Sequence, residues 1–126
     1  SNSEPAEIPI FNKDFRTKSL LKEAMNDNDF LKHLDLDSGQ MKEIIDAMYP
    51  QQFSPGSWII KEGDVGSHLY VAANGELEVF KEDKLLGRIL ACKAFGELAI
   101  LYNCKRTASI KAVTEVKVWV LDRRVY

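Results

Sequence analysis

The sequence predicts an α+β fold in which N-terminal helices precede a small antiparallel β jelly-roll barrel. The pattern changes near Pro50. Before this residue, apolar side chains recur at a spacing of three to four residues, as on one face of a helix. After it, short β-prone runs alternate with turns, and six of the seven glycines lie in this part. Many short strands separated by turns are typical of jelly rolls and small barrels. A length of 126 residues fits one such unit.

Two helices are expected before Pro50. The first carries apolar residues from Leu20 to Met25 and the second from Met41 to Met48. Asp37 and Ser38 are suitable N-caps for the second helix, and Pro50 should end it. Between the helices, an apolar turn is expected at Phe30, Leu31 and Leu34. Residues 1–16 are expected to be a linker that starts with a cloning remnant, and residues 17–50 a helical bundle.

The barrel is expected over residues 51–122. Asn74-Gly75 is a strong signal for a two-residue hairpin, because both central positions of that turn need positive φ. Glu82-Asp83 marks another turn. The expected strands are Trp58 to Ile60, Leu69 to Val71, Leu77 to Phe80, Leu85 to Leu90, Ala108 to Ile110 and Val116 to Leu121.

Composition and charge exclude several classes of function. The net charge of −2 gives no basic surface for nucleic acid or a membrane. No apolar run approaches the length that spans a bilayer, and residues 1–5 lack the pattern of a signal peptide. Cys92 and Cys104 show neither CxxC spacing nor a disulfide framework, which suits a reducing compartment. We therefore expect a soluble, cytoplasmic domain without nucleic-acid or membrane contacts.

The segment from Phe95 to Ser109 has the features of a phosphate site. A short helix is expected over residues 97–102, and a helix N-terminus offers unpaired N–H groups to an anion. Gly96 permits close approach of the ligand to the backbone because it has no side chain. Glu97 can accept a hydrogen bond from a sugar hydroxyl, and Arg106 can make a forked contact to phosphate oxygens. Each residue alone could be an ordinary surface charge or core residue, but their ordered combination indicates a ligand site.

The run FGELAILYNCKRTA, at residues 95–108, resembles the phosphate-binding cassette of cyclic nucleotide-binding domains. The variant is similar to the first of the two tandem domains of cGMP-dependent protein kinases, and the likeness extends from about Lys18 to the last residue. Details at residues 16–18, 78–80 and 107–109 resemble the type II kinase more than type I. Other matching segments are Ile59 to Gly66, Leu69 to Val79 and the helical lead-in from Leu31 to Tyr49.

The resemblance implies a binding role for each residue of the site. Backbone amides of Gly96, Glu97, Leu98 and Ala99, with the Arg106 guanidinium, would hold the cyclic phosphate. Glu97 would accept the ribose 2′-hydroxyl. Thr107 would reach the guanine 2-amino group and favour cGMP, with cAMP bound more weakly. Leu85 and Leu86 match positions beside the base, although they could equally be core leucines. No catalytic residue, metal or cofactor is expected.

In the parent protein, the resemblance implies that cGMP relieves autoinhibition of a serine/threonine kinase domain. The expected partners in cis are that kinase domain and a second nucleotide-binding domain. This fragment should be monomeric, and the parent should dimerise through an upstream coiled coil; any membrane anchor would also lie upstream. Residues 123–126 would begin the helices that close over the base. The sequence departs from the family pattern at Leu90 to Lys93, where family members usually have a Gly-Pro-Gly-like turn.

Other functions remain open at this point. The same fold could bind cAMP in a kinase regulatory subunit, or gate a cyclic nucleotide-gated ion channel, although Thr107 disfavours the first. A ligand-free scaffold with a decayed pocket is disfavoured by Glu97 and Arg106. A jelly-roll metalloenzyme would need several converging histidines, and the chain has only His33 and His68. The chain also lacks the glycine-rich loop, VAIK-like strand and HRD segment of a kinase catalytic domain.

Overall fold

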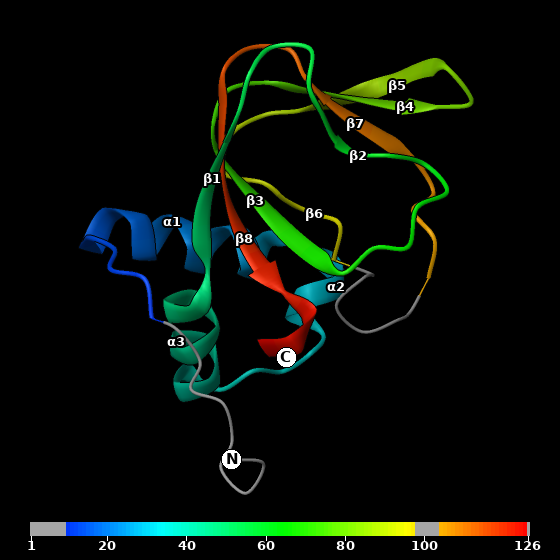
Figure 1. Cartoon of the computed structure of the whole chain (residues 1–126). Helices are drawn as coiled ribbons and strands as arrows, with labels where there is room; N and C mark the ends of the chain where they lie inside the picture. The colour runs from blue at the N-terminus through cyan, green and yellow to red at the C-terminus, as the bar shows by residue number, and fades with distance from the viewer. Residues whose placement is uncertain (1–9, 98–103, 126) are drawn as a thin grey trace, which may run out of the picture.

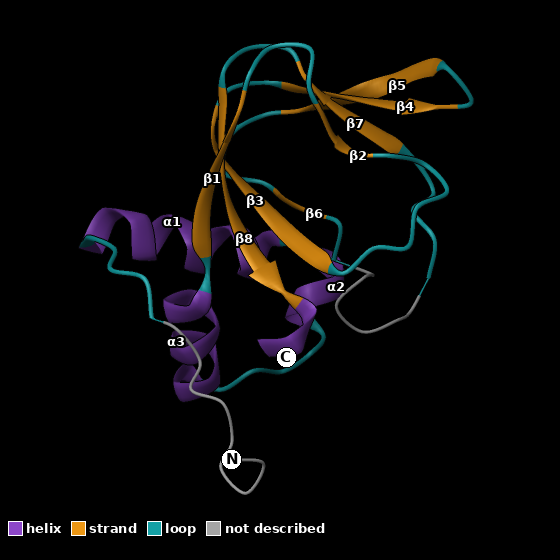
Figure 2. Ribbon diagram, in the orientation of Figure 1, coloured by secondary structure: helices purple, strands orange, loops and turns teal. Residues whose placement is uncertain are grey.

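The computed structural model describes residues 10–97 and 104–125. It has N-terminal helices and two four-stranded antiparallel sheets, as expected for a jelly roll (Figures 1 and 2). The first sheet has the order β1-β8-β3-β6 and the second β2-β7-β4-β5; pairing among the described residues does not close them into one barrel. The strands are β1 (Tyr49–Phe53), β2 (Trp58–Ile60), β3 (His68–Asn74), β4 (Leu77–Lys81), β5 (Lys84–Ile89), β6 (Ala94–Phe95), β7 (Ser109–Ala112) and β8 (Val116–Asp122).

Short polar side chains set the start of each helix. The helices are α1 (Phe15–Asp27), α2 (Asp29–Lys32) and α3 (Ser38–Ala47). Asp14 caps α1 and Asn28 caps α2 by accepting backbone N–H bonds. Asp37 caps α3 in a capping box with Gln40, which confirms the prediction for this residue. Helix α1 begins two residues before the predicted boundary at residue 17.

The strand β1 was not expected from the sequence. Helix α3 already ends at Ala47, and Pro50 lies inside β1, paired with Trp119. A proline cannot donate a ladder hydrogen bond, so it is confined mainly to edge strands. β1 is such an edge, because it has β8 on one side only. Pro50 therefore marks a sheet edge and not the point where the helix stops.

The helices, the first sheet and the second sheet form three layers. Two apolar clusters lie between them, one on each face of the first sheet. Side chains alternate along β3, so Leu69 and Val71 pack against the helices, and Tyr70 and Ala72 pack toward the second sheet. The buried Leu31 of α2 joins the first cluster, and Phe30 and Leu34 pack against it, as the predicted apolar turn requires. The helices therefore cover one face of the first sheet, and the second sheet covers part of the other (Figure 1).

The two predicted turns have different outcomes. The Asn74-Gly75 hairpin is wrong, because β3 and β4 belong to different sheets and only Gly75 has positive φ, at 95°. A Cβ at Gly75 would overlap the backbone oxygen of Glu115, which explains the glycine without a hairpin. The Glu82-Asp83 turn is confirmed: it joins β4 to β5, with φ of 52° and 65°. The backbone thus adopts the geometry of a two-residue hairpin without the usual glycine.

Candidate functional site

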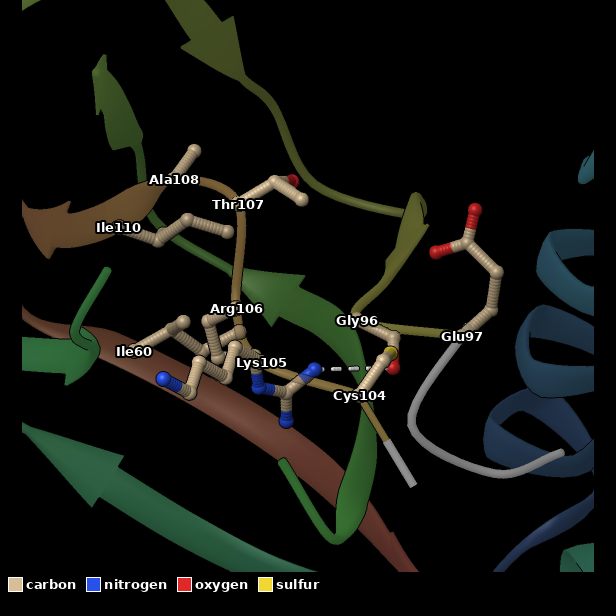
Figure 3. Close-up of a pocket in the computed structure, with 9 residues that line it drawn as sticks. All are labelled: Ile60, Gly96, Glu97, Cys104, Lys105, Arg106, Thr107, Ala108 and Ile110. Atoms are coloured by element: carbon tan, nitrogen blue, oxygen red, sulfur yellow. Dashed lines mark hydrogen bonds between the residues drawn. The ribbon is translucent and has the colours of Figure 1, made fainter. Parts of the chain in front are cut away.

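Described residues of the predicted phosphate segment line a cavity of about 210 Å³ at the end of β6. Three separate parts of the chain meet there: the end of β2, the residues after β6 and the segment that leads into β7 (Figure 3). The nine lining residues are Ile60, Gly96, Glu97, Cys104, Lys105, Arg106, Thr107, Ala108 and Ile110. The structure therefore brings Gly96, Glu97, Arg106 and Thr107 to one cavity.

Arg106 is held by backbone groups on both sides. Its Nη1 donates to the Gly96 carbonyl oxygen at 3.1 Å, and its Nη2 donates to the His68 carbonyl oxygen at 2.8 Å. Its backbone N–H donates to Asp64 O at 2.7 Å, and its carbonyl oxygen accepts from Gly63 N at 2.9 Å. Among the described residues these are the only hydrogen bonds of the guanidinium, so Nε–H and one N–H on each Nη nitrogen remain for a ligand.

The charge of Arg106 lacks a carboxylate partner in the described part of the chain. Burial lowers the pKa of this half-buried guanidinium, and nearby Tyr70, Cys104 and Glu97 oppose the effect. An arginine nevertheless stays protonated near neutral pH. A partly buried cation without a bound anion is electrostatically incomplete. The site is thus suited to an anionic group such as a phosphate.

Gly96 gives Arg106 the room for this arrangement. Its φ is 77°, in the left-handed region that side-chain-bearing residues rarely adopt. A Cβ there would lie 2.9 Å from Arg106 Nη1 and 3.3 Å from His68 O. The preceding Phe95 is buried and stacks on Tyr70, with ring centroids 5.3 Å apart. The aromatic pair therefore fixes the strand from which Gly96 extends.

The side chains of Glu97 and Thr107 lie on different sides of the cavity. In Figure 3 the Glu97 carboxylate points away from the Arg106 guanidinium, on the side of the N-terminal helices. Glu97 also lines a second hollow with Asp27 and Lys93. Thr107 is exposed at the rim. Leu98 and Ala99, with most of the helix expected over residues 97–102, lie outside the described residues.

Leu85 and Leu86 are not core leucines. Their exposed fractions are 52% and 62%, and they lie on β5, an edge strand of the second sheet. Neither residue lines the cavity around Arg106. Their proposed place beside a base therefore stays a prediction, while the alternative interpretation as core residues is wrong.

The unusual segment from Leu90 to Lys93 still forms a turn before the site. Cys92 has φ of 72°, a conformation that glycine adopts without strain. Its N–H donates to Ala72 O at 2.6 Å, and Ala72 N–H donates to Lys93 O at 3.0 Å. Lys93 also forms an ion pair with Asp27 of α1 at 2.7 Å. The departure from the family sequence therefore does not prevent the chain from turning into β6.

Sequence reasoning missed several parts of the site. Ile60 and Ile110 line the cavity as partners across β2 and β7, a pairing that depends on the tertiary fold. The short β-prone runs that contain these two residues are the only sequence signal for them. The carbonyl oxygens of His68 and Gly96 are backbone groups and have no sequence signal. Cys104 and Lys105 also line the cavity, although neither is a residue type that the phosphate-binding pattern singles out.

Two other classes of site find no support in the described residues. No group of three or more histidine, cysteine, aspartate or glutamate side chains in that part of the chain could hold a metal ion. His33 lies at the end of α2 and His68 at the start of β3, on different elements. Among the helices that the structure describes, none is long and apolar enough to cross a membrane.

Comparison with known families and curated proteins gives a consistent result. A family model described as "Cyclic nucleotide-binding domain" matches residues 50–126. The "cGMP-dependent protein kinase, isozyme 1" of Drosophila melanogaster is 52% identical over 120 residues, which are 94% of this chain and 15% of that protein. The human "cGMP-dependent protein kinase 2" is 52% identical over 114 residues, or 90% of this chain and 15% of the kinase. The chain thus spans about one seventh of these relatives.

Solved structures of kinase regulatory subunits share the fold. The regulatory domain of Toxoplasma gondii PKA with cAMP has a TM-score of 0.78 and 30% identity, covering 90% of this chain and 44% of that one. The regulatory subunit of a cAMP-independent protein kinase A from Trypanosoma cruzi, bound to guanosine, has a TM-score of 0.81 and 26% identity, covering 98% and 44%.

Replacing Gly96 by alanine tests the backbone geometry of the site. We expect Gly96→Ala to lower the free energy of unfolding by about 1–2 kcal/mol, because the residue must keep a left-handed conformation and its Cβ crowds Arg106. Urea denaturation of the purified chain measures the change. Gly87→Ala is the matched control, since nothing lies within 4 Å of a Cβ there and its φ is not positive. Equal stability of the two variants would contradict the assigned role of Gly96.

Proposed function

Because this chain belongs to the cyclic nucleotide-binding domain family, we propose that it binds cGMP as a regulatory domain of a cGMP-dependent serine/threonine protein kinase. The observation that carries the proposal is the half-buried Arg106, which two carbonyl oxygens orient and which has no carboxylate partner among the described residues. The similarity to cGMP-dependent kinases over most of the chain supports the choice of nucleotide. Ligand binding and not catalysis is the role of this segment.

The cyclic phosphate would be bound by Arg106 and the backbone around Gly96. The N–H groups of Arg106 that remain available can donate to the exocyclic oxygens, and a charge-assisted hydrogen bond of this kind contributes about 1.5–3 kcal/mol. The backbone amides of residues 96–99 would add further donors. Gly96 leaves room for the ligand because no Cβ projects into the cavity.

The ribose and the base would contact the two remaining polar side chains. Glu97 lines the cavity, and a change of rotamer would turn its carboxylate to accept the ribose 2′-hydroxyl. Thr107 would offer its hydroxyl to the guanine 2-amino group, which adenine lacks. One neutral hydrogen bond contributes about 0.5–1.5 kcal/mol, so the preference for cGMP over cAMP would be about two- to tenfold at this contact. Leu85 and Leu86 would provide apolar surface on the base side.

The ligands in two similar solved structures suggest alternatives to cGMP. The similar Toxoplasma gondii domain was solved with cAMP, and the similar Trypanosoma cruzi subunit with guanosine. We propose cAMP as a weaker ligand here. A nucleoside without phosphate would leave the charge of Arg106 unmatched, so we expect it to bind less well than cGMP. The curated kinases that match favour this role over that of an ion-channel domain.

In the longer protein, cGMP would act by favouring one of two conformational states. Binding shifts such an equilibrium only if the nucleotide has different affinity for the two states. We propose that the favoured state releases inhibition of the kinase domain in the same chain, next to a second nucleotide-binding domain. A homodimer formed through an upstream coiled coil, a monomeric isolated fragment and a cytoplasmic location are also parts of this proposal.

Substitution of Arg106 tests the phosphate contact. We expect Arg106→Lys and Arg106→Ala to weaken cGMP binding by about 100-fold or more, because lysine cannot reproduce a forked contact and alanine removes the charge. Isothermal titration calorimetry measures the dissociation constant. Arg88→Ala is the control, since Arg88 of β5 pairs with Glu76, the residue before β4, and does not line the cavity. Unchanged affinity for cGMP in both Arg106 variants would contradict the proposal that Arg106 binds the phosphate.

Substitution of Thr107 tests the choice of base. We expect Thr107→Ala to reduce the cGMP-to-cAMP affinity ratio by about two- to tenfold while cAMP affinity stays constant, since only guanine loses a hydrogen bond. Thr107→Ser keeps the hydroxyl and should retain the ratio. Competition titrations with both nucleotides provide the measurement. If Thr107→Ala leaves the cGMP-to-cAMP affinity ratio unchanged, residues other than Thr107 determine the selectivity.

A further inference from the structure

Helices α1 and α3 form a second hollow, on the side of the molecule that the helices cover. Its volume is about 340 Å³, and all of its lining residues belong to these two helices. None of them lines the cavity around Arg106. Both helices lie on the face of the first sheet that is turned away from the second sheet (Figure 1). The hollow is therefore separate from the proposed nucleotide site.

One side of the hollow is a strip along α1. Phe15, Lys18, Ser19 and Lys22 line it, and their spacing of three and four residues places them on one face of the helix. Phe15 is 85% exposed, the largest exposed fraction among the large apolar residues that the structure describes. Lys18 and Lys22 are exposed and form no ion pair with another described residue. The strip therefore combines an exposed aromatic ring with two available positive charges.

The other side of the hollow lies on α3. Its lining residues are Ser38, Met41, Lys42, Ile45 and Asp46. Ile45 is buried and Met41 partly buried, so they provide apolar surface within the hollow. Lys42 pairs with Asp46 at 2.9 Å, and Asp46 is the only acidic residue that lines the hollow. Three lysines and one aspartate make the hollow positive, although the whole chain has a net charge of −2.

We propose that this hollow, the α1–α3 groove, binds an amphipathic helix of a partner protein whose apolar face is flanked by acidic residues. An exposed apolar ring such as that of Phe15 gains free energy when a partner removes it from water. Acidic side chains of the partner would meet Lys18 and Lys22, and this complementarity of charge would select the partner. The inference goes beyond the proposed function, since the groove shares no residue with the nucleotide site.

The shape of the groove favours a helix over a membrane surface. Residues 15–22 and 38–46 each extend over about 10–12 Å, at a rise of about 1.5 Å per residue. A helix of about two turns presents apolar side chains over that length, which is the pattern of helix-in-groove recognition. A flat lipid surface would contact the exposed Phe15 and the lysines, but it would not fill a hollow at whose base Ile45 is 5% exposed.

A synthetic peptide tests the chemistry of the groove. The probe is a peptide of about 18 residues, long enough to form a helix, with leucine on one face and glutamate on both flanks. The control probe has lysine in place of glutamate. We expect the chain to bind the glutamate probe at least about tenfold more tightly, because only glutamate complements the lysines of the groove. Fluorescence anisotropy of the labelled peptides measures both affinities, and salt should weaken the binding of the glutamate probe.

Substitutions on α1 locate the binding site. We expect Phe15→Ser to weaken binding of the glutamate probe by at least about tenfold, since the partner then buries no aromatic ring. Lys18→Glu should weaken it about three- to tenfold through the reversed charge. Leu90→Ser and Lys84→Glu are the matched controls, because both residues are exposed and lie outside the groove. Their affinity for the probe should stay within about twofold of the unaltered chain.

Measurements of fold and of cGMP binding accompany these variants. Phe15 and Lys18 are exposed, so we expect their substitution to leave the circular dichroism spectrum and the unfolding transition nearly unchanged. The affinity for cGMP should also stay the same, since neither side chain lines the cavity around Arg106. Failure of the unaltered chain to bind cGMP would overturn the proposed function and leave the inference about the groove intact.

The remaining outcomes separate a partner helix from other occupants. Absent binding of the glutamate probe, equal binding of the two probes, or binding that Phe15→Ser and Lys18→Glu leave unchanged would overturn the inference. Dimers in sedimentation velocity that Phe15→Ser dissociates would assign the groove to a second copy of the chain. Cosedimentation with vesicles of phosphatidylcholine and phosphatidylserine that Phe15→Ser abolishes would assign it to a membrane. Either of these two results would also overturn the inference.

Discussion

The hydrogen bonds of Arg106 are the constraint on which the candidate site depends. The guanidinium bridges the Gly96 and His68 carbonyl oxygens, so it joins the residue after β6 to the start of β3. Its backbone is bonded to Gly63 and Asp64 in the turn after β2. Three segments separated by many residues are therefore held around one cation. A side chain oriented before the ligand arrives loses less entropy on binding, which is the physical advantage of this arrangement.

The packing of the two sheets brings these three segments together. Alternation along β3 puts Leu69 and Val71 against the helices and Tyr70 toward the second sheet. A shift of one residue in its pairing with β8 would exchange the two faces, so burial on both sides fixes the register strongly. That register also places His68 opposite Asp122. The packing of the core and the geometry of the cavity therefore share one cause.

Much of this arrangement could be predicted from local sequence. The N-cap at Asp37 and the turn at Glu82-Asp83 follow from short-range hydrogen bonding and turn geometry, and both are confirmed. The grouping of Gly96 with Arg106 around one cavity also agrees with the prediction from the segment that contains them. These features depend on residues that are close in the sequence or on a recognisable combination of residue types.

The errors concern pairing between distant segments. Gly75 has the positive φ that Asn74-Gly75 suggests, but the strand that follows joins the other sheet. Pro50 is tolerated in β1 because this strand is the edge of its sheet, a property that depends on which strand is outermost. The exposure of Leu85 and Leu86 likewise depends on which segments of the folded chain cover β5, and this is a tertiary property. The carbonyl partners of Arg106 could not be predicted, since every residue but proline has the same backbone groups.

The most direct test of the account is a comparison of cGMP with guanosine in calorimetric titrations of the purified chain. The two ligands share the base and the ribose, but only cGMP has a phosphate for Arg106. The account predicts saturable binding of cGMP at one site and affinity for guanosine at least about 100-fold lower, since the loss of two charge-assisted hydrogen bonds costs about 3 kcal/mol or more. Equal affinity for the two ligands, or binding of guanosine alone, would contradict it.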